Sequence, residues 1–582
     1  MEADFPESGE RERDAAGPET PPARRGRSVR YKNKTLLSTI DPVGQAERAA
    51  AKSCGQDRTL YFCPSPLLGY GLDTLLARLG PDSAVLCAET DRKLLALSLT
   101  SIGGHILNHP RFLLSGSGSG ADLCALIRER WGARVFRRVE TVKLSGGWQL
   151  DREGYEGLAD FLQRDLALGW GNAMTLVKLG RRFMRNSLRN LAPLGRARPL
   201  GEASFGARPV LILGAGPSLD PVLDGLARAG LFGTPRRSSF GVICVDTCLS
   251  VLRERGIRPD LTVILESQFW NMKDFTGFRN AGIPAALDLS AYPAAVDILG
   301  GPVFFFFTPW TGLRIFERMA AAGLLPPALP PLGSVGISAV ELARRLSSGP
   351  LVTAGIDFSF TPERMHARSS PAHLGILADL NRFKSPFSPG GFRQGVFTTL
   401  SKSGTPVKSD PAMRTYRGLF ERHFAGEKRI RDIAGSGLPL GLDTLDMEEA
   451  VLLLGGGPPE NPSPERKETP GIPPPEGPEE KDGPGAGNPP ASAPHIIPAL
   501  GDFIRRERAL LEQLRDTLTG GGDREELERL LDEADYLWAH FPDCAGAEGR
   551  RPPASDLGFL KRVRAETDPF ITLWNLAAAL NG

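Results

Sequence analysis

One turn near the middle of the chain carries the residues best placed for chemistry. The apolar run Val210–Leu213 is followed directly by Gly214, Ala215, Gly216, Pro217 and Ser218. Glycines let a backbone approach a ligand closely, and Pro217 stands where a helix would begin. Ser218 can cap this helix, and the free N–H groups of a helix N-terminus form an anion site. Because tight strand-to-helix turns need glycine in any case, this turn alone is weak evidence for a ligand.

Polar or small residues also stand at the ends of the neighbouring elements. Asp246 and Thr247 follow the run Val242–Val245, Glu266 follows Leu261–Leu265, Asp357 follows Leu351–Ala354, and Ser334, Gly336 and Ser338 open a helix. In an open parallel sheet, ligands bind beyond the carboxyl ends of the strands. Each residue by itself also fits a turn or a helix cap. Their recurrence at corresponding ends predicts a single nucleotide-binding crevice.

Acid–base chemistry needs a group that titrates near neutral pH, and His366 is the candidate. It lies nine residues after Asp357, in a segment rich in turn-forming residues. We predict that His366 and Asp357 are catalytic, although a single histidine also fits a surface or structural position. Asp246, Glu266 and Asp357 could instead bind Mg²⁺ held by a triphosphate, or hydrogen-bond a ribose. Their spacing does not separate these alternatives.

The elements that must position these residues alternate between strand and helix. Continuous apolar runs, separated by amphipathic segments such as Leu313–Met319 and Ser338–Leu346, are typical of a parallel sheet covered on both faces. This pattern predicts an α/β chain whose central Rossmann-like domain spans residues 205–435. Connecting helices are expected over residues 151–204, where apolar residues recur at three- and four-residue steps.

A smaller α/β unit is predicted at residues 31–150. Its strands Thr59–Cys63 and Ala84–Ala88 are separated by a glycine-bearing turn and a helix, and the second strand ends at Glu89. This order is that of a Rossmann-type unit. The turn lacks the full GxGxxG spacing, which favours a structural, degenerate Rossmann-like half over an intact nucleotide site.

The remaining segments differ in composition. Residues 1–30 are polar and rich in glycine and proline, which predicts a disordered tail. Residues 455–497 are dominated by proline, glycine and glutamate, which predicts a disordered linker. Residues 498–582 contain three amphipathic stretches, which predict a helical C-terminal domain for docking or assembly.

The composition excludes several classes of function. A net charge of +2, from 70 basic and 68 acidic side chains, gives no general attraction to nucleic acid. The chain has no apolar run of about 18 residues and no secretory signal, so neither a membrane span nor export is expected. Seven scattered cysteines without a CxxC pair indicate reduced thiols and no metal site. We therefore expect a cytoplasmic protein.

Several of these segments resemble the motility accessory factor family of flagellin glycosyltransferases, which shares the MptE-like domain of the 6-hydroxymethyl-dihydropterin diphosphokinases. The resembling segments are Gly214–Asp220, Asp246-Thr247 with Pro259-Asp260 and Glu266, Gly333–Val335, Gly355–Phe358 with His366, and Leu37–Pro42 with Glu47. The resemblance covers roughly residues 31–435. The chain departs from the family pattern at Glu266, where the family usually has aspartate, at Leu332, where it has glycine, and at Leu37, where it has histidine.

The resemblance implies a sialyltransferase-like central domain that binds a CMP-activated nonulosonic acid. The sugar would pass to serine or threonine hydroxyls of flagellin, with His366 accepting the proton and no metal required. One alternative is an ATP- and Mg²⁺-dependent diphosphokinase acting on 6-hydroxymethyl-dihydropterin. Another is a non-catalytic nucleotide-binding scaffold. The departures bear on the donor more than on the fold.

Overall fold

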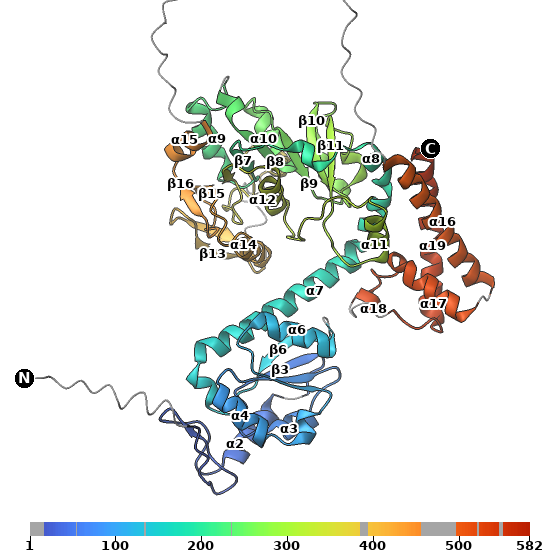
Figure 1. Ribbon diagram of the computed structural model, residues 1–582. Coiled ribbons are helices and arrows are strands. Elements are labelled where there is room, and N and C mark those ends of the chain that lie inside the picture. The colour runs from blue at the N-terminus through green and yellow to red at the C-terminus, as the bar shows by residue number, and fades with distance from the viewer. Residues whose placement is uncertain are drawn as a thin grey trace, which may run out of the picture. The chain divides into compact units, whose positions relative to one another are not determined.

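The structure is a computed structural model that describes residues 17–53, 55–132, 135–233, 236–384, 394–455, 496–520, 523–545 and 551–581. The chain forms two compact units (Figure 1). The first consists of the residues up to Gly180 together with Trp538–Phe559, and the second of Arg181–Leu537 together with the residues from Leu560 onward. Each unit has a parallel sheet of its own.

The first unit is built on a four-stranded parallel sheet with the order β5-β4-β3-β6. The strands are β3 (Thr59–Pro64), β4 (Ala84–Ala88), β5 (Phe112–Ser115) and β6 (Arg138–Thr141). Alternate residues of β3 enter two different cores, Tyr61 and Cys63 into one, Leu60 and Phe62 into the other. This alternation follows from the two-residue period of a strand, and it explains why both central strands read as continuous apolar runs.

Helices cover both faces of this sheet (Figure 1). One face carries α2 (Pro42–Lys52), α3 (Leu72–Ala77), α4 (Arg92–Ser101) and α5 (Gly104–Leu107). The other carries α6 (Gly120–Trp131) and the first part of α7 (Arg152–Arg189), with Leu123, Leu158 and Leu162 in its core. A short 3₁₀ helix, η1 (Gly147–Leu150), precedes α7. The predicted Rossmann-like unit is therefore a doubly wound sheet.

The prediction of a disordered tail that extends to residue 30 is wrong for its described part. Residues 17–30 are folded: Glu19 pairs with Arg30, which begins the short hairpin β1 (Arg30–Tyr31) and β2 (Lys34–Thr35), and Val29 is fully buried. Burial of one apolar side chain and backbone pairing outweigh a polar composition here. Residues 1–16 of the predicted tail, and residues 456–495 of the predicted linker, lie outside the described residues.

The second unit contains an eight-stranded sheet in which every pair of neighbours is parallel, with the order β11-β10-β9-β8-β7-β12-β15-β16. The strands are β7 (Val210–Leu213), β8 (Gly241–Val245), β9 (Leu261–Ile264), β10 (Ile283–Asp288), β11 (Gly300–Phe306), β12 (Leu351–Ala354), β15 (Ile430–Ile433) and β16 (Asp443–Leu445). The chain runs outward from β7 to β11, then returns to place β12 on the other side of β7. This confirms the predicted parallel α/β fold and creates a reversal of strand order between β7 and β12.

Helices cover this sheet on both faces as well. The helices of this unit include α8 (Leu191–Arg196), α9 (Leu219–Arg228), α10 (Leu249–Glu254), α11 (Arg314–Ala321), α12 (Val335–Leu346), α13 (Pro371–Ala378), α14 (Pro411–His423) and α15 (Met447–Gly455). Of these, α13 buries none of its residues. Helix α12 packs across β7, β8, β9 and β12, on the side opposite α9 and α10 (Figure 1). Right-handed crossovers require this arrangement, because the direction of winding changes after β11.

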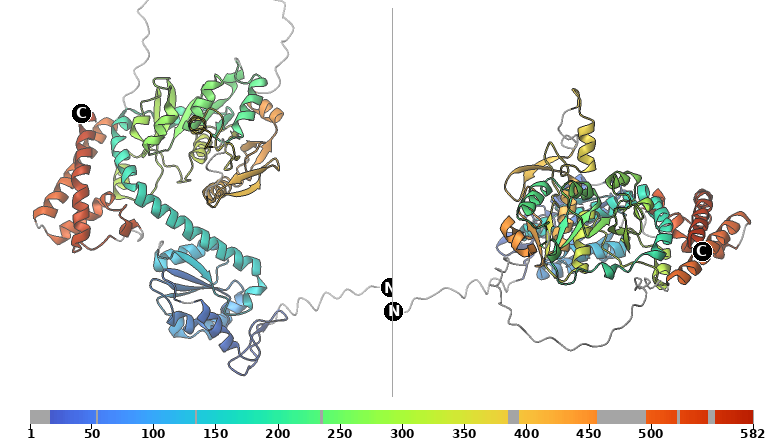
Figure 2. Two further views of the ribbon diagram at one scale, coloured as in Figure 1. Left: turned by 180° about the vertical axis from the view of Figure 1, so that it is seen from behind. Right: turned by 90° about the horizontal axis from the view of Figure 1, so that it is seen from above.

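Four strands of the second unit were not predicted from the sequence. The antiparallel hairpin β13 (Phe397–Leu400) and β14 (Pro406–Ser409) and the strands β15 and β16 are short and rich in polar residues. Two-residue alternation over four residues is too short a signal to recognise. Figure 2 shows the hairpin and α13 at the rim of this unit.

The C-terminal stretches are helical, as predicted: α16 (Ile496–Gly520), α17 (Arg524–Glu533), η8 (Asp535–Leu537), α18 (Pro542–Ala545) and α19 (Leu557–Asn581). Within the second unit, Arg318 of α11 forms ion pairs of 2.6 Å with both Glu507 and Glu533. Helices α16 and α17 are thus attached to the unit that carries the large sheet. Among the described residues, no helix is long and apolar enough to cross a membrane.

Candidate functional site

The turns that leave β7 and β12 meet at the reversal of strand order. The N–H of Gly214 donates to the carbonyl oxygen of Ala354 (2.8 Å), and the N–H of Gly216 donates to that of Gly355 (2.8 Å). Gly355 has φ +70°, and a Cβ atom there would overlap the carbonyl oxygen of Gly214. Glycine is therefore required by both the backbone conformation and the close approach of the two turns. The predicted crevice residues from these two segments lie together.

Asp357 links the same two turns from inside. It is buried, and its two carboxylate oxygens accept hydrogen bonds from the backbone N–H of Ser218 (2.7 Å) and from the Ser218 hydroxyl. Burial raises the pKa of Asp357, although both bonds from Ser218 oppose this. Ser218 directly precedes α9, but its hydroxyl does not cap that helix as predicted, because it binds the carboxylate instead. The geometry gives Asp357 a positioning role.

Asp246 and Thr247 begin the 3₁₀ helix η4 (Asp246–Cys248) at the carboxyl end of β8. Asp246 is 3% exposed. One of its oxygens accepts from the N–H of Thr247 (2.8 Å) and from the Thr247 hydroxyl (3.3 Å), and the other accepts from Asn271 (2.7 Å). Burial raises the pKa of Asp246, and these bonds partly offset that rise. The prediction that Asp246 lies at this edge is confirmed.

Two neighbours of Asp246, Asn271 and Asp274, were not predicted as site residues from the sequence. The 3₁₀ helix η5 (Phe269–Phe275) follows β9 and carries Asn271 and Asp274, which are 4% and 6% exposed. Asn271 donates from one amide nitrogen to both Asp246 and Asp274 (2.7 and 3.1 Å). Burial, followed by the charge of Asp246, raises the pKa of Asp274 to about 7. Short 3₁₀ segments have no periodic signature, so the sequence held no indication of this cluster.

Glu266 lies near the buried carboxylates Asp246 and Asp274, and its charge raises the pKa of both, but it differs from them in exposure. It is exposed, and its side chain accepts a hydrogen bond from the N–H of Gln268 (2.9 Å). The next residues, Phe269 and Trp270, are also largely exposed at this strand end. Glu266 therefore stands at the rim of the crevice, where an extra methylene relative to aspartate lengthens its reach.

The N-terminus of α12 forms a further wall. Ser334 precedes the helix without a side-chain cap, whereas Gly336 and Ser338 are buried in its first turns. A Cβ on Gly336 would lie 3.9 Å from Ile356, which places this helix end beside the turn after β12. Tyr416 of α14 lies against Gly333, where an added Cβ would be 2.8 Å from the ring. Because Tyr416 is distant in sequence, only the fold reveals it.

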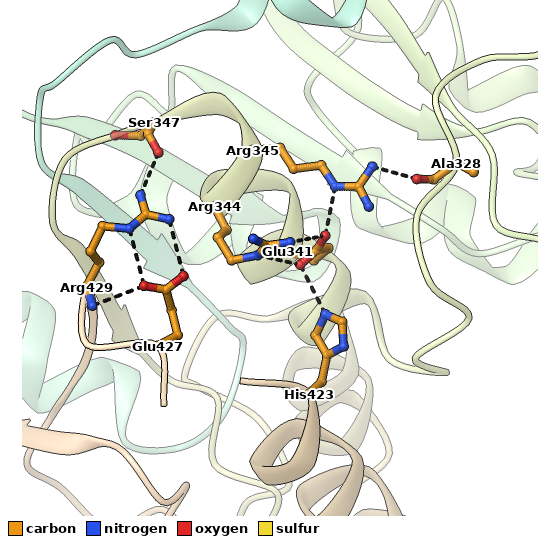
Figure 3. Close-up of polar contacts among 8 residues, drawn as sticks. All are labelled: Ala328, Glu341, Arg344, Arg345, Ser347, His423, Glu427 and Arg429. Carbon is orange, nitrogen blue, oxygen red and sulfur yellow. Dashed lines mark hydrogen bonds and ion pairs between the residues drawn. The ribbon is translucent and has the colours of Figure 1, made fainter. Parts of the chain in front are cut away.

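A buried ion cluster holds α12 and α14 together at their other ends (Figure 3). Glu341 is fully buried and accepts hydrogen bonds from Arg344 (2.9 Å), Arg345 (2.7 Å) and His423 (3.1 Å). These partners outweigh the effect of burial and lower the pKa of Glu341 to about 2. His423 and Tyr416 belong to the same helix, so the cluster fixes the helix that presents Tyr416 to the N-terminus of α12.

His366 lies beside the first turn. The N–H of the next residue, Ala367, donates to the carbonyl oxygen of Ala215 (2.9 Å), which ties this segment to the turn after β7. His366 is partly buried, and its pKa is lowered by burial and by the nearby charge of Lys273. The imidazole is therefore neutral at neutral pH and able to accept a proton. Lys273 belongs to η5, so His366 and the Asp246 neighbourhood occupy the same part of the sheet edge.

The predicted carboxylates follow three different strands. Across the part of the chain that the structure describes, no three histidine, cysteine, aspartate or glutamate side chains are close enough to hold a metal ion. Asp246, Glu266 and Asp357 therefore do not form a three-carboxylate group. The residues that could hold a nucleotide are the two glycine turns, Ser334 and Tyr416.

Similarity to known proteins was found at three levels. Residues 181–363 match the model of the family described as 6-hydroxymethylpterin diphosphokinase MptE-like. A protein of Treponema pallidum (strain Nichols) described as uncharacterized is 28% identical over 558 residues, which cover 94% of this chain and 93% of that protein. The structure is similar to that of the MAf glycosyltransferase from Magnetospirillum magneticum AMB-1, with a TM-score of 0.52 and 15% identity over 99% of this chain and 94% of that chain.

The family match lies within the region that the structural match covers. The family match spans β7 to β12 and therefore contains most of the crevice. At 15% identity, the structural match establishes a common fold. The chain thus contains an MptE-like domain at residues 181–363 within the fold of a MAf glycosyltransferase, which confirms the resemblance to the motility accessory factor family.

Proposed function

We propose that this protein is a glycosyltransferase of the motility accessory factor type, which transfers a nonulosonic acid from a CMP-sugar to serine or threonine hydroxyls of flagellin. One observation carries this proposal: the reversal of strand order between β7 and β12 brings two glycine turns, His366 and the N-terminus of α12 together. Both the fold and the MptE-like match support a nucleotide ligand at this place.

The donor phosphate would lie at the N-terminus of α12. Ser334 leaves its hydroxyl free of the helix cap, and the first N–H groups of a helix favour a negative charge. Tyr416 stands beside this position and can donate its phenolic hydrogen. A developing negative charge on the leaving phosphate is stabilised by such fixed donors, and this reaction requires no metal ion in principle.

His366 would accept the proton of the acceptor hydroxyl. Its lowered pKa keeps the ring neutral at physiological pH, which is the form a general base needs. Asp357 would act through structure, since both of its oxygens are engaged by Ser218.

A diphosphokinase that uses ATP and Mg²⁺ remains the second candidate, because the family match carries that description. Such chemistry uses one or more carboxylates near the metal, and Asp246 and Asp274, which share the Asn271 amide, are the acidic pair at this edge. The third candidate is a scaffold without catalytic activity. Such a protein would bind the nucleotide in this crevice but would not transfer the sugar.

Nucleotide-dependent thermal stabilisation separates the candidates. A ligand that binds only the folded state raises the melting temperature. We expect CMP to raise it and ATP with Mg²⁺ to leave it unchanged. The opposite result would favour the diphosphokinase.

Transfer itself is measured with a CMP-nonulosonic acid donor and purified flagellin, with the glycosylated protein detected by mass spectrometry. We expect His366→Ala to lower transfer by at least 100-fold while CMP still stabilises the protein. Replacement of His109, a histidine of the first unit, by alanine is the matched control and should leave transfer unchanged. Full transfer by His366→Ala would show that another group accepts the proton.

A further inference from the structure

The Asp246, Asn271 and Asp274 side chains form a buried polar cluster between the carboxyl ends of β8 and β9. All three are more than nine-tenths buried. The amide nitrogen of Asn271 joins them, with hydrogen bonds of 2.7 Å to Asp246 and 3.1 Å to Asp274. Two carboxyl groups thus share one donor at the edge of the sheet where ligands bind.

Two oxygens of this cluster have no protein partner. Oδ1 of Asn271 and Oδ1 of Asp274 are buried, and neither has a hydrogen-bond partner among the described residues. An unpaired buried acceptor costs about 1–3 kcal/mol, so such atoms are usually satisfied by a ligand, a water or a proton. A proton on Asp274, a water or a ligand is therefore needed to complete the hydrogen bonds of this cluster.

Asp246 and Asp274 differ in the number of hydrogen bonds that they accept. Asp246 accepts hydrogen bonds from the Thr247 N–H, the Thr247 hydroxyl and Asn271. Asp274 accepts from Asn271 alone. Hydrogen bonds to a carboxylate stabilise its ionised form, so Asp246 ionises first and its charge holds a proton on Asp274. The pKa of about 7 for Asp274 agrees with this order.

The charged groups around Asp274 are of both signs, and Lys273 is the positive one. Asp246 and Glu266 raise its pKa and Lys273 lowers it, while the thiol of Cys248 lies close enough to sense its charge. Lys273 is exposed and forms no ion pair with any described residue. Lys273 lies near both His366 and Asp274, so its positive charge favours a phosphate oxygen that reaches these two residues.

We propose that Asp274 is the general acid of this crevice and protonates the phosphate oxygen that leaves the sugar. This inference rests on the proposed glycosyl transfer and adds a catalytic residue to it. In this scheme the neutral imidazole of His366 accepts the proton of the acceptor hydroxyl, and the neutral carboxylic acid of Asp274 donates a proton to the leaving phosphate.

The acceptor oxygen forms a bond to the anomeric carbon as its proton passes to His366. The bond between that carbon and the phosphate oxygen breaks, and its electron pair stays on the oxygen, which receives the proton of Asp274. Exchange of protons with water then restores neutral His366 and protonated Asp274.

The test compares Asp274→Asn with Asp288→Asn. Asp288 is an equally buried carboxylate at the carboxyl end of β10, but Ser290 and Thr308 satisfy both of its oxygens. We expect Asp274→Asn to lower kcat/KM by about 10²–10⁴-fold and to remove the alkaline limb of the pH–rate profile, near pH 7. Asp288→Asn should lower the melting temperature and keep that limb. Retention of both the rate and the limb by Asp274→Asn would overturn the proposal.

A second measurement does not depend on turnover. The infrared carbonyl band of a protonated carboxyl, present in the wild type and absent from Asp274→Asn, reports the titration of Asp274. CMP should raise the pH at which this band disappears, because a phosphate beside Asp274 disfavours its ionisation. If CMP moves the band while no sugar is transferred, glycosyl transfer fails and contact of Asp274 with phosphate stands. If the wild type transfers sugar and CMP leaves the band unmoved, the role of Asp274 is refuted.

Discussion

The two parallel sheets of this protein place an acidic residue at the same kind of position, with opposite consequences. In the first unit, Glu89 follows β4 and is 1% exposed. It accepts hydrogen bonds from Ser65 (2.6 Å), Tyr155 (3.0 Å) and the N–H of Asp91 (3.1 Å). In the second unit, Asp246 follows β8 and opens the cluster in which Asn271 and Asp274 keep unpaired oxygens.

This difference separates a structural strand end from a functional one. The polar groups beyond β3 are partnered within the protein, because Ser145 donates to the carbonyl oxygen of Ser65 (2.6 Å) and Gly147 packs directly against the Ser65 side chain. A completed hydrogen-bond network leaves nothing for a ligand to satisfy. The incomplete network in the second unit does. The same fold thus serves as a scaffold in one unit and as the candidate site in the other.

The strongest test of this contrast replaces one glycine in each unit. Gly355→Ala combines a φ of +70° with an overlap against the turn after β7, and we expect it to cost at least about 3 kcal/mol of unfolding free energy and to abolish stabilisation by CMP. Gly71→Ala, with φ +83° and a Cβ 2.7 Å from the carbonyl oxygen of Ala46, should destabilise the first unit and leave CMP binding intact. Chemical denaturation with and without CMP measures both. Loss of CMP binding in Gly71→Ala would contradict the contrast.

The ion cluster around Glu341 is a charged network of the second unit, whereas the network around Glu89 in the first unit consists of hydrogen bonds from Ser65, Tyr155 and the N–H of Asp91. Glu341→Gln leaves Arg344 and Arg345 without their buried carboxylate, and we expect it to cost about 3 kcal/mol. The pKa of Glu341 is lowered to about 2, so its contribution to stability is complete above its ordinary pKa and is lost as the pH falls from there toward 2. Denaturant midpoints between pH 2 and 7 should show a gap between the wild type and the variant that closes on the acid side. A gap that stays constant would refute this assignment.

The two acidic strand ends should differ in nucleotide affinity. Asp246→Asn disturbs the cluster in the crevice, and we expect it to weaken CMP binding by about 10-fold, or about 1.4 kcal/mol. Glu89→Gln should leave the CMP affinity unchanged, since the hydrogen bonds of Glu89 are internal to the first unit. Isothermal titration calorimetry with CMP gives both values. Equal losses would mean that the two strand ends are not functionally distinct.

The raised pKa of Asp274 should make its contribution to the stability of the folded state decrease as the pH rises. Its pKa is raised to about 7, so between its ordinary pKa and pH 7 the folded state keeps a proton that the unfolded state has lost. Stability must therefore fall as the pH rises through this window and level off above it. Asp274→Asn removes this slope, so its stability relative to the wild type should increase up to pH 7. Melting curves at constant ionic strength measure it, and a parallel course of the two proteins would exclude the raised pKa.

The smallest expected effects on CMP binding come from two tyrosines. Tyr155→Phe removes the hydrogen bond to Glu89 and two that the hydroxyl accepts from Thr90, and it should cost about 1–3 kcal/mol without altering CMP binding. Tyr416→Phe, beside the N-terminus of α12, should keep stability and weaken CMP binding by a few-fold. Thermal denaturation and calorimetry distinguish the two. Reversed effects would place the ligand elsewhere.

Much of the architecture could be predicted from local pattern. The strands β7, β12 and β4 begin and end as expected, because continuous apolar runs bounded by glycine or an acidic residue leave little ambiguity. The strands β15 and β16 and the hairpin β13–β14 were not recognised, since their short, polar segments become strands only by pairing with elements already in place.

The sequence by itself determined the parallel α/β fold and the chemical identity of the strand-end residues, because both follow from local periodicity and from the residue that succeeds each strand. Only the tertiary structure decided which of these residues are free to act. Asp357 is engaged by Ser218, whereas Asp274 keeps an unpaired oxygen. Burial and hydrogen-bond partners decide this, and both arise from segments far apart in the chain. That physical reason explains why Asp274 and Tyr416 had no signal in the sequence.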